Sequence, residues 1–369
     1  MSENENLVLY RKYRPKRFAE VVGQTHIVSA IGNAVKEGKI AHAYLFSGPR
    51  GVGKTTVARL IAKALNCEGK DKPCDSCAAC VAFNEGRAFD LIEIDAASNR
   101  GIDEIRELRD AVRFVPAQGK FKTYIVDEVH MLTKEAFNAL LKTLEEPPAH
   151  AVFVLATTEL DRVPATIVSR TQHYSFHRLN VKEIADLLVA IGKKEVVKID
   201  ADASRMIAFA AEGSLRDAES ILGQIMTVED EEITRAEVES ILGMPRRESA
   251  KALFELIAKK DAKTALALIE EAASQGYDMQ YVSKMLLQYF RAALFMKTDP
   301  ALKRFIESDF FPDEIEVLER NLASFSVEDI SWGLETILSN MQSLRRSPIP
   351  QLPLEITVVE LIAGAGAKS

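Results

Sequence analysis

The sequence predicts an α/β domain built on a parallel sheet, followed by two helical segments. Short apolar runs rich in β-branched residues alternate with helical patterns up to about residue 178. A glycine-rich phosphate-binding motif follows the first of these runs, and only helical periodicity continues beyond Phe176. The length of 369 residues is enough for two or three domains of ordinary size.

Four apolar runs are the predicted strands of the sheet. Because they are nearly continuous in apolar residues, we expect each strand to be buried on both faces by helices. The helical patterns between them indicate a doubly wound α/β arrangement. The runs are AYLFS (Ala43–Ser47), DLIEID (Asp90–Asp95), TYIVD (Thr123–Asp127) and AVFVLATT (Ala151–Thr158).

Composition and charge exclude some classes of protein. No stretch approaches the roughly 20 apolar residues that a membrane span needs, and the first fifteen residues contain no apolar signal core. We therefore expect a cytoplasmic protein with no membrane partner. The net charge of −7 gives no general attraction to nucleic acid, so any DNA contact requires a local basic surface.

The motif GPRGVGKT matches the phosphate-loop pattern GxxxxGK[ST] and lies between a predicted strand and an amphipathic helix. Its glycines allow a tight turn that directs backbone N–H groups at phosphate oxygens, and the helix N-terminus favours an anion there. We expect it to bind ATP, with the lysine at the β and γ phosphates and the threonine at Mg²⁺. The residues are Gly48, Pro49, Arg50, Gly51, Val52, Gly53, Lys54 and Thr55.

Two acids end the third predicted strand, at the sheet edge where open α/β sheets bind ligands. Asp127 suits a position beside Mg²⁺, together with Thr55, and Glu128 suits activation of an attacking water. A solvated turn is the alternative explanation for paired acids, but their place after a phosphate loop favours catalysis. We expect His130, two residues on, to be a structural histidine.

All four cysteines of the chain fall within residues 67–80. Their spacing, C-x6-C-x2-C-x2-C, can close a tetrahedral Zn²⁺ site, and an insert placed after the phosphate-loop helix is expected to be structural rather than catalytic. The ligand set alone leaves an iron–sulfur cluster open. The expected zinc ligands are Cys67, Cys74, Cys77 and Cys80.

Two helical parts are predicted after the α/β domain of residues 1–178. Residues 179–243 begin with a capping box at Asn180 and Glu183 and form a small helical domain. Residues 244–369 carry further apolar stripes, one of them Leu334, Ile337, Leu338, Met341 and Leu344. Three prolines between residues 348 and 353 break the chain before a last helix.

The order of motifs resembles that of the gamma/tau subunits of bacterial DNA polymerase III, which are AAA+ clamp-loader ATPases. The resemblance extends over essentially the whole chain, and the four-cysteine insert separates it from archaeal and eukaryotic clamp-loader subunits. It implies an AAA+ domain, a helical lid and an all-α collar. The motifs are YRKYRPKRFAEVVGQTHI, GPRGVGKT, the insert, DEVHML, LLKTLEEPP, ATT, SR and GSLRDA.

The resemblance also implies roles for single residues. Thr157 resembles the first sensor near the γ-phosphate, and Val22 and Gly23 would lie near the adenine. Arg170 resembles the arginine finger that reaches a neighbouring subunit's ATP, although Thr171 replaces the cysteine that usually follows it.

Arg216 resembles the second sensor, and the residues support this independently. Ser214 is a predicted N-cap, which places Arg216 in the first helical turn, where a cation opposes the helix dipole unless an anion binds there. A surface ion pair with Asp217 or Glu219 is the alternative.

Three basic residues are candidate DNA contacts. Arg100 and Arg106 lie at the start of a predicted helix that follows a strand, a position that suits phosphate contacts without base reading. Lys142 is a third candidate, by resemblance. A solvated charged face explains each of them equally well.

The expected function is therefore that of an ATPase subunit of a clamp loader, which uses ATP, Mg²⁺ and Zn²⁺. The resemblance implies a pentameric ring with delta and delta-prime type subunits, a sliding clamp and primer–template DNA as partners. One alternative is an AAA+ DNA helicase or remodelling motor, and another is a non-catalytic scaffold in such a ring.

Overall fold

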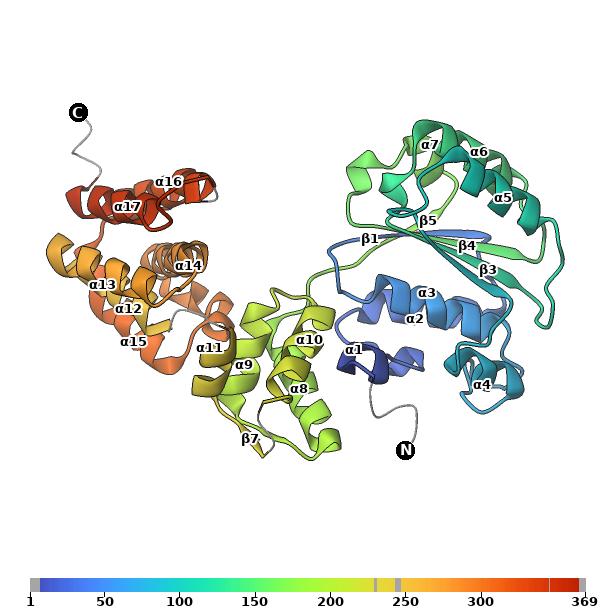
Figure 1. Cartoon of the computed structure of the whole chain (residues 1–369), viewed down its shortest axis with the longest axis horizontal. Coiled ribbons are helices and arrows are strands. Elements are labelled where there is room, and N and C mark those ends of the chain that lie inside the picture. Colours follow the sequence, from blue (N-terminus) through green and yellow to red (C-terminus); the bar gives the residue numbers. More distant parts are fainter. Residues whose placement is uncertain (1–6, 229–230, 243–246, 345, 365–369) are drawn as a thin grey trace. The chain divides into compact units, whose positions relative to one another are not determined.

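The computed structural model describes residues 7–228, 231–242, 247–344 and 346–364 (Figure 1). The chain divides into two compact units. The first unit contains Met1–Val197 and Ile207–Asp230, and the second contains Lys198–Met206 and Glu231–Ser369. None of the helices within the described ranges is both long enough and apolar enough to cross a membrane.

Five strands in the described part of the first unit form one parallel sheet in the order β2-β3-β4-β1-β5. Every neighbouring pair is parallel, and Ser47 of β1 pairs with Thr157 of β4, which aligns the carboxyl ends of the central strands. That alignment brings the residues after these strands to one edge of the sheet. The strands are β1 (Ala43–Ser47), β2 (Leu91–Asp95), β3 (Lys122–Asp127), β4 (Ala151–Thr157) and β5 (Gln172–Ser175).

Helices cover both faces of this sheet (Figure 1). Alternate strand residues point to opposite faces, so Tyr44 and Phe46 pack against one helical layer and Leu45 packs against the other. The first layer contains α2 (Thr25–Glu37) and α3 (Lys54–Leu65). The second contains α5 (Ile102–Val112), α6 (Lys134–Glu145) and α7 (Ala165–Val168).

The first unit contains further helices besides these two layers, and among them α10 packs against α1 and α8. Asn180 caps α8 through the predicted capping box, because its side chain accepts from the Glu183 amide at 2.8 Å while Glu183 accepts from the Asn180 amide at 3.0 Å. The elements are α1 (Leu9–Lys12), η1 (Phe18–Glu20), α4 (Ala78–Asn84), η2 (Val129–Met131), η3 (Leu160–Arg162), α8 (Val181–Glu195) and α10 (Leu215–Ile225).

The second unit is mainly helical around its own apolar core. α12 and α14 contribute several of its largest buried side chains, including Phe254, Tyr289 and Phe290. Its helices are α11 (Arg235–Leu242), α12 (Arg247–Ala258), α13 (Ala262–Ser274), α14 (Met279–Thr298), η4 (Pro300–Phe305), η5 (Glu307–Asp309), α15 (Pro312–Asn321), η6 (Leu322–Ser324), α16 (Val327–Leu344) and α17 (Leu352–Ala363). α9 (Ala201–Ala210) contributes residues to both units.

The predicted fold class is confirmed, with three corrections of detail. β5 was not predicted, because QHYS is polar and lies at a sheet edge where its side chains are mostly exposed. β2 is half-buried rather than buried on both faces, for the same edge position. Two short strands, β6 (Lys198–Ile199) and β7 (Glu232–Ile233), pair in parallel within a segment predicted to be wholly helical.

Two expectations in the second unit also differ from the structure. Leu338 of α16 was assigned to an apolar stripe of this helix, yet it is 54% exposed. The three prolines do not all precede the last helix. Pro353 lies in the first turn of α17, where its missing N–H costs no helical hydrogen bond.

Candidate nucleotide site and cysteine cluster

The phosphate loop runs from the end of β1 into α3, which begins at Lys54. Gly51 has a φ of +75°, and a Cβ at this position would lie 1.9 Å from the Ser214 hydroxyl oxygen. The Leu215 amide also donates to the Gly51 carbonyl at 3.0 Å. A glycine is therefore required where the N-terminus of α10 packs against the loop.

Thr55 and Asp127 lie together at the edge of the sheet. The Thr55 hydroxyl donates to Asp127 Oδ2 at 2.8 Å, although 72 residues separate them in the chain. A hydroxyl and a carboxylate in contact are hard oxygen ligands of the kind that Mg²⁺ prefers. The donor set predicted for magnesium therefore fits this ion.

Glu128 follows Asp127 in a left-handed conformation, with a φ of 49°. Such backbone is costly for a residue other than glycine and is concentrated at functional sites. Its carboxylate oxygen Oε2 accepts from the Thr158 hydroxyl at 2.9 Å and from the Thr158 amide at 3.2 Å. These two donors fix the direction of the carboxylate.

Lys54 is a buried cation whose partners are backbone carbonyls. Its ammonium donates to the Gly48 oxygen at 2.7 Å and to the Pro49 oxygen at 2.8 Å, and its residue is 6% exposed. Burial lowers the pKa of Lys54, and the nearby Glu128 and Asp127 offset only part of that effect. In the part of the chain that the structure describes, no carboxylate lies within 4 Å of its nitrogen.

A cavity of about 780 Å³ opens beside the loop, within the first unit. Of the predicted nucleotide-site residues it contacts Arg50 to Thr55, Asp127, Glu128, Arg216 and Val22. Gly48, Pro49, Gly23 and Thr157 are not among its lining residues. Residues that were not predicted for the nucleotide site complete the wall, among them Tyr10, Arg11, Arg14, Glu93, Asp95 and Glu219.

Arg216 lies in the first turn of α10, as predicted, because the Ser214 hydroxyl caps that helix by accepting from the Asp217 amide. Its guanidinium carbon is 4.8 Å from the centre of the Tyr10 ring. A hydrogen bond from Arg216 lowers the pKa of the Tyr10 hydroxyl. Within the described residues Arg216 makes no ion pair with Asp217 or Glu219.

Two buried polar groups beside the cavity were not predicted as site residues from the sequence. Arg14 Nη1 has no hydrogen-bond partner among the described residues. Glu219 is 6% exposed, and burial raises its pKa to about 7 against the opposing effect of Arg14. Arg14 and Glu219 are 205 positions apart, so only the fold brings them together. The nearest signal in the sequence is the motif GSLRDA, which ends just before Glu219.

The remaining predicted residues lie outside the cavity wall. Thr157 is fully buried at the end of β4, where its hydroxyl contacts His130 Nδ1 at 3.0 Å. Arg170 follows α7 and pairs with Glu145 at 2.7 Å. Arg170 is not among the residues that line the cavity beside this chain's own phosphate loop.

The three candidate DNA contacts are exposed but differ in their surroundings. Arg100 lies two positions before the first residue of α5 and donates to the Ala97 carbonyl, whereas Arg106 lies in the second turn and pairs with Asp103 at 3.0 Å. Lys142 lies near the end of α6, which packs against α5. The expected position at a helix start is thus correct for Arg100 and displaced by one turn for Arg106.

The four cysteines converge, with all their sulfurs within 4.8 Å of one another. Four thiolates about 2.3 Å from a zinc ion lie under about 4 Å from each other, so a small contraction would suffice. Amides of Gly69 and Cys74 donate to Cys67 Sγ at 3.4 and 3.2 Å, and the Cys77 amide donates to Cys74 Sγ at 3.3 Å. Such donors stabilise thiolates, and the set fits zinc.

The thiol environments are unequal. Hydrogen bonds from the Ser76 and Cys77 amides lower the pKa of Cys74, whereas burial raises the pKa of Cys67 and of Cys80. A bound divalent cation would favour the thiolate at all four positions.

Lys63 of α3 anchors this insert to the nucleotide domain. It is 2% exposed, pairs with Asp75, and donates to Asn84 Oδ1 at 2.7 Å and to the Lys16 carbonyl at 3.1 Å. The cluster is therefore attached to the phosphate-loop helix but lies outside the residues that line the cavity.

Comparison with known proteins decides the family. Residues 23–180 match the family described as "DNA polymerase III, delta subunit", residues 183–229 match "DNA polymerase III clamp loader subunit, ATPase lid domain", and residues 233–368 match "DNA polymerase III subunits gamma and tau domain III". A Buchnera aphidicola protein named DNA polymerase III subunit gamma is 36% identical over 357 residues, which are 96% of this chain and 98% of that protein. The chain belongs to the DNA polymerase III gamma/tau family.

Longer members of the gamma/tau family are also similar. The tau subunit of Bacillus subtilis is 39% identical over 355 residues, and that of Escherichia coli is 40% identical over 359 residues. The chain spans 62% and 55% of these two relatives, respectively. Among solved structures, Thermotoga maritima RuvB has a TM-score of 0.48 at 20% identity, covering 66% of this chain and 79% of that one.

Proposed function

We propose that the chain is an ATP-hydrolysing subunit of a bacterial clamp loader, which uses ATP to place a sliding clamp on primed DNA. The observation that carries this proposal is the cavity where the phosphate loop, Asp127 and Glu128 meet in a gamma/tau family member. Its buried Lys54 and its neighbours Arg50 and Arg216 lack carboxylate partners within the described residues. A polyphosphate would supply the missing negative charge.

In this proposal the amides of residues 51–55 and the Lys54 ammonium bind the β and γ phosphates. Thr55 and Asp127 would hold Mg²⁺, which polarises the phosphoryl oxygens when it is bound. Glu128 orients the attacking water and accepts its proton. Val22 and Gly23 would lie beside the adenine, with Thr157 and Arg216 near the terminal phosphate.

Arg170 would act on the ATP of a neighbouring subunit. Arg170 does not line its own chain's nucleotide cavity, which supports a role between subunits rather than within one. Its ion pair with Glu145 would be exchanged for the neighbour's phosphate. Other clamp-loader subunits of delta and delta-prime type, the sliding clamp and primer–template DNA are the partners in this proposal. Arg100, Arg106 and Lys142 are its candidate DNA contacts.

The domain division 1–178, 179–243 and 244–369 assigns an ATPase domain, a lid and a collar. The last boundary lies between residues 243 and 244, outside the described residues. Exposed apolar side chains support a collar role for the second unit, because Leu338, Ile356 and Val359 are 54%, 47% and 44% exposed. Such side chains on α16 and α17 suit packing between subunits.

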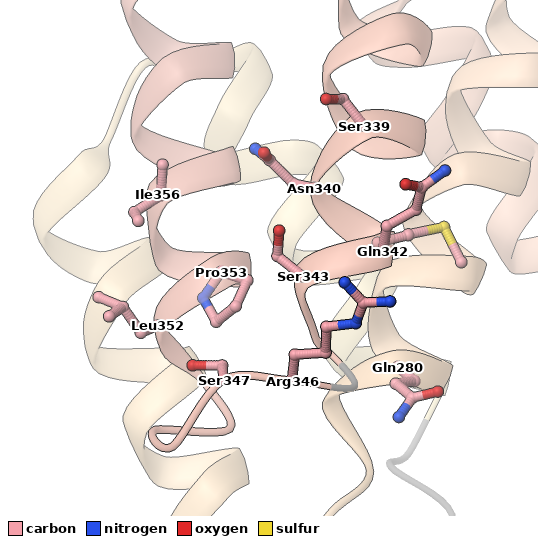
Figure 2. Close-up of a pocket in the computed structure, with 11 residues that line it drawn as sticks. Gln280, Ser339, Asn340, Gln342, Ser343, Arg346, Ser347, Leu352, Pro353 and Ile356 are labelled. Atoms are coloured by element: carbon pink, nitrogen blue, oxygen red, sulfur yellow. The ribbon is translucent and has the colours of Figure 1, made fainter.

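A cavity of about 880 Å³ adjoins this apolar surface, between α16, α17 and the start of α14. Figure 2 shows Asn340 and Ser343 of α16 facing Pro353 and Ile356 of α17 across it, with Arg346 at one end. No acidic side chain is among the described residues that line it. The cavity therefore suits a packing interface better than a hydrolytic site.

For the insert we propose one structural zinc ion on Cys67, Cys74, Cys77 and Cys80. Metal analysis of the purified chain should find one zinc and no iron per chain. A metal content well below one per chain would refute the site.

A clamp-loading assay with the full set of subunits tests the main proposal. The chain should support loading and show ATP hydrolysis that clamp and primed DNA stimulate. Unwinding or translocation without clamp loading would instead identify a helicase or remodelling motor. Loading with no hydrolysis by this chain would identify a scaffold.

A further inference from the structure

Thr158 is the first residue after β4, and both of its hydrogen-bond donors are directed at the proposed catalytic carboxylate. Its hydroxyl lies 2.9 Å and its amide 3.2 Å from Glu128 Oε2. His130 Nδ1 is 3.5 Å from the same oxygen, but its closer partner is the Thr157 hydroxyl at 3.0 Å. The short contacts on this carboxylate oxygen therefore come from Thr158.

The two carboxylate oxygens of Glu128 are used differently. Oε2 accepts both donors of Thr158, whereas Oε1 takes part in no hydrogen bond or ion pair with the residues that the structure describes. The Glu128 side chain is 29% exposed and lines the nucleotide cavity. Oε1 is thus the oxygen that is available to a ligand or a water in that cavity.

Glu128 is also held through its backbone. Its φ is 49°, and its amide donates to Asp127 Oδ1 at 3.0 Å, while Asp127 Oδ2 accepts from the Thr55 hydroxyl at 2.8 Å. Left-handed backbone at a residue other than glycine persists only where the surroundings determine it. The amide and the carboxylate of Glu128 are therefore fixed by separate partners, and the partner of the carboxylate is Thr158.

The central strand β4 determines where Thr158 lies. β4 pairs with β3 on one side and with β1 on the other, and all of its residues are buried. Its last residue, Thr157, lies opposite Ser47 of β1. A donor placed directly after a packed central strand holds its acceptor more precisely than a donor in the middle of a loop.

Thr158 is not among the residues that line the cavity, and its one hydroxyl proton is donated to Glu128. We propose that Thr158 is a positioning residue, which directs Glu128 so that Oε1 accepts the proton of the attacking water. This inference rests on the proposed function and deepens it. Thr158 acts through Glu128 and does not itself touch the nucleotide.

The hydrolysis step explains why this direction matters. The water oxygen forms a bond to the γ phosphorus, the bond from that phosphorus to the bridging oxygen of ADP breaks, and the water proton passes to Glu128 Oε1. A general base has to lie within about 2.6–3.2 Å of the oxygen whose proton it accepts. A carboxylate that rotates freely meets this condition for only part of the time, so the Thr158 hydroxyl contributes to kcat.

Steady-state ATP hydrolysis by the full chain, with partner subunits, clamp and primed DNA, tests the proposal. Thr158→Val keeps the branched shape and the amide but removes the hydroxyl. Loss of a hydrogen bond to a charged acceptor should lower kcat about tenfold and leave KM within about twofold. Thr158→Ser restores the donor and should recover most of kcat. Thr227→Val, at an exposed threonine outside the cavity wall, is the matched control and should equal the wild type.

A double variant shows whether Thr158 acts through Glu128. In Glu128→Gln the proton acceptor that Thr158 positions is absent, so adding Thr158→Val should change the residual turnover less than about twofold. Calorimetric titration with Mg²⁺ and a slowly hydrolysed ATP analogue should give Thr158→Val a Kd within about twofold of the wild-type value. Equal binding shows that the nucleotide site is folded in the variant.

Wild-type kcat in Thr158→Val would overturn the role of Thr158 while leaving the ATPase proposal intact. A loss of nucleotide binding in that variant, a loss of kcat that serine does not rescue, or a tenfold loss that persists in the Glu128→Gln background would also overturn it, because each indicates a general structural role. A complete absence of nucleotide binding in the wild-type chain would refute the proposed function and this role together.

Discussion

Two buried cations, one in each unit, are held in opposite ways. Arg247 of the second unit is 1% exposed and is clamped by Glu314, with Nε 2.7 Å from Oε1 and Nη2 2.8 Å from Oε2. Arg247 Nη2 also donates to the Asp309 carbonyl at 3.1 Å. Lys54 of the first unit is 6% exposed, and among the described residues its hydrogen bonds go to carbonyl oxygens of its own loop.

The difference separates a structural charge from a functional one. A buried charge is costly unless it is paired, and Arg247 has its counter-charge within the protein. Lys54 has none within 4 Å among the described residues, so a ligand has to provide it. The comparison therefore predicts that removal of Arg247 damages stability and removal of Lys54 damages binding.

Arg247→Met should have the largest effect on stability. It leaves Glu314 as an uncompensated buried charge, which we expect to lower the free energy of unfolding by about 3–5 kcal/mol. Urea denaturation monitored by circular dichroism measures this. In the double variant Arg247→Met, Glu314→Leu no charge remains, so much of the loss should be recovered; a double variant as unstable as the single one would contradict the pairing.

Glu219→Gln extends the comparison of buried charges to a buried acid in the wall of the nucleotide cavity. In the folded chain the pKa of Glu219 is raised from 4.5 to about 7. The folded state therefore binds more protons than the unfolded state between these pH values. The stability that the neutral carboxyl contributes is lost as the pH rises through about 7. At about 1.36 kcal/mol per pH unit, the ionised carboxylate costs up to about 3 kcal/mol at pH 8.

The glutamine variant should therefore be more stable than wild type at pH 8, and the difference should largely vanish near pH 4.5. Thermal or urea unfolding at the two pH values measures it. A difference that is the same at both would show that the carboxyl does not titrate near neutrality.

Lys54→Met should have the smallest effect on stability. The variant removes a desolvated ammonium whose pKa is lowered by burial. The free energy of unfolding of the nucleotide-free variant should therefore be within about 1 kcal/mol of the wild-type value or slightly above it. ATP should then no longer raise the unfolding temperature, as it should for wild type. A large loss of stability without nucleotide would place Lys54 with Arg247 as a structural cation.

Local sequence patterns were sufficient for the central strands and the phosphate loop. β1 was predicted at Ala43–Ser47 and is found there, because a buried strand next to a glycine-rich turn is marked by its own residues. The caps at Asn180 and Ser214 were likewise visible in a few neighbouring residues. The roles of the remaining motifs were assigned by the resemblance to a known family.

Features that depend on distant residues could not be predicted. Arg247 and Glu314 are 67 positions apart, and neither belongs to a motif. Arg14 and Glu219 meet at the cavity only because α1 packs on α10. Leu338 follows the helical period of a buried stripe, yet the core of the second unit does not extend over it, so periodicity alone overestimates its burial.

The most direct test of the nucleotide site is to compare ATP binding and ATP hydrolysis in the Glu128→Gln variant with those of the wild-type chain, in the presence of partner subunits, clamp and primed DNA. The account predicts that binding is retained and that turnover falls by about 10²–10⁴-fold, because the amide cannot accept the proton of the attacking water. Wild-type turnover in this variant would contradict the assignment of this cavity as the site of hydrolysis.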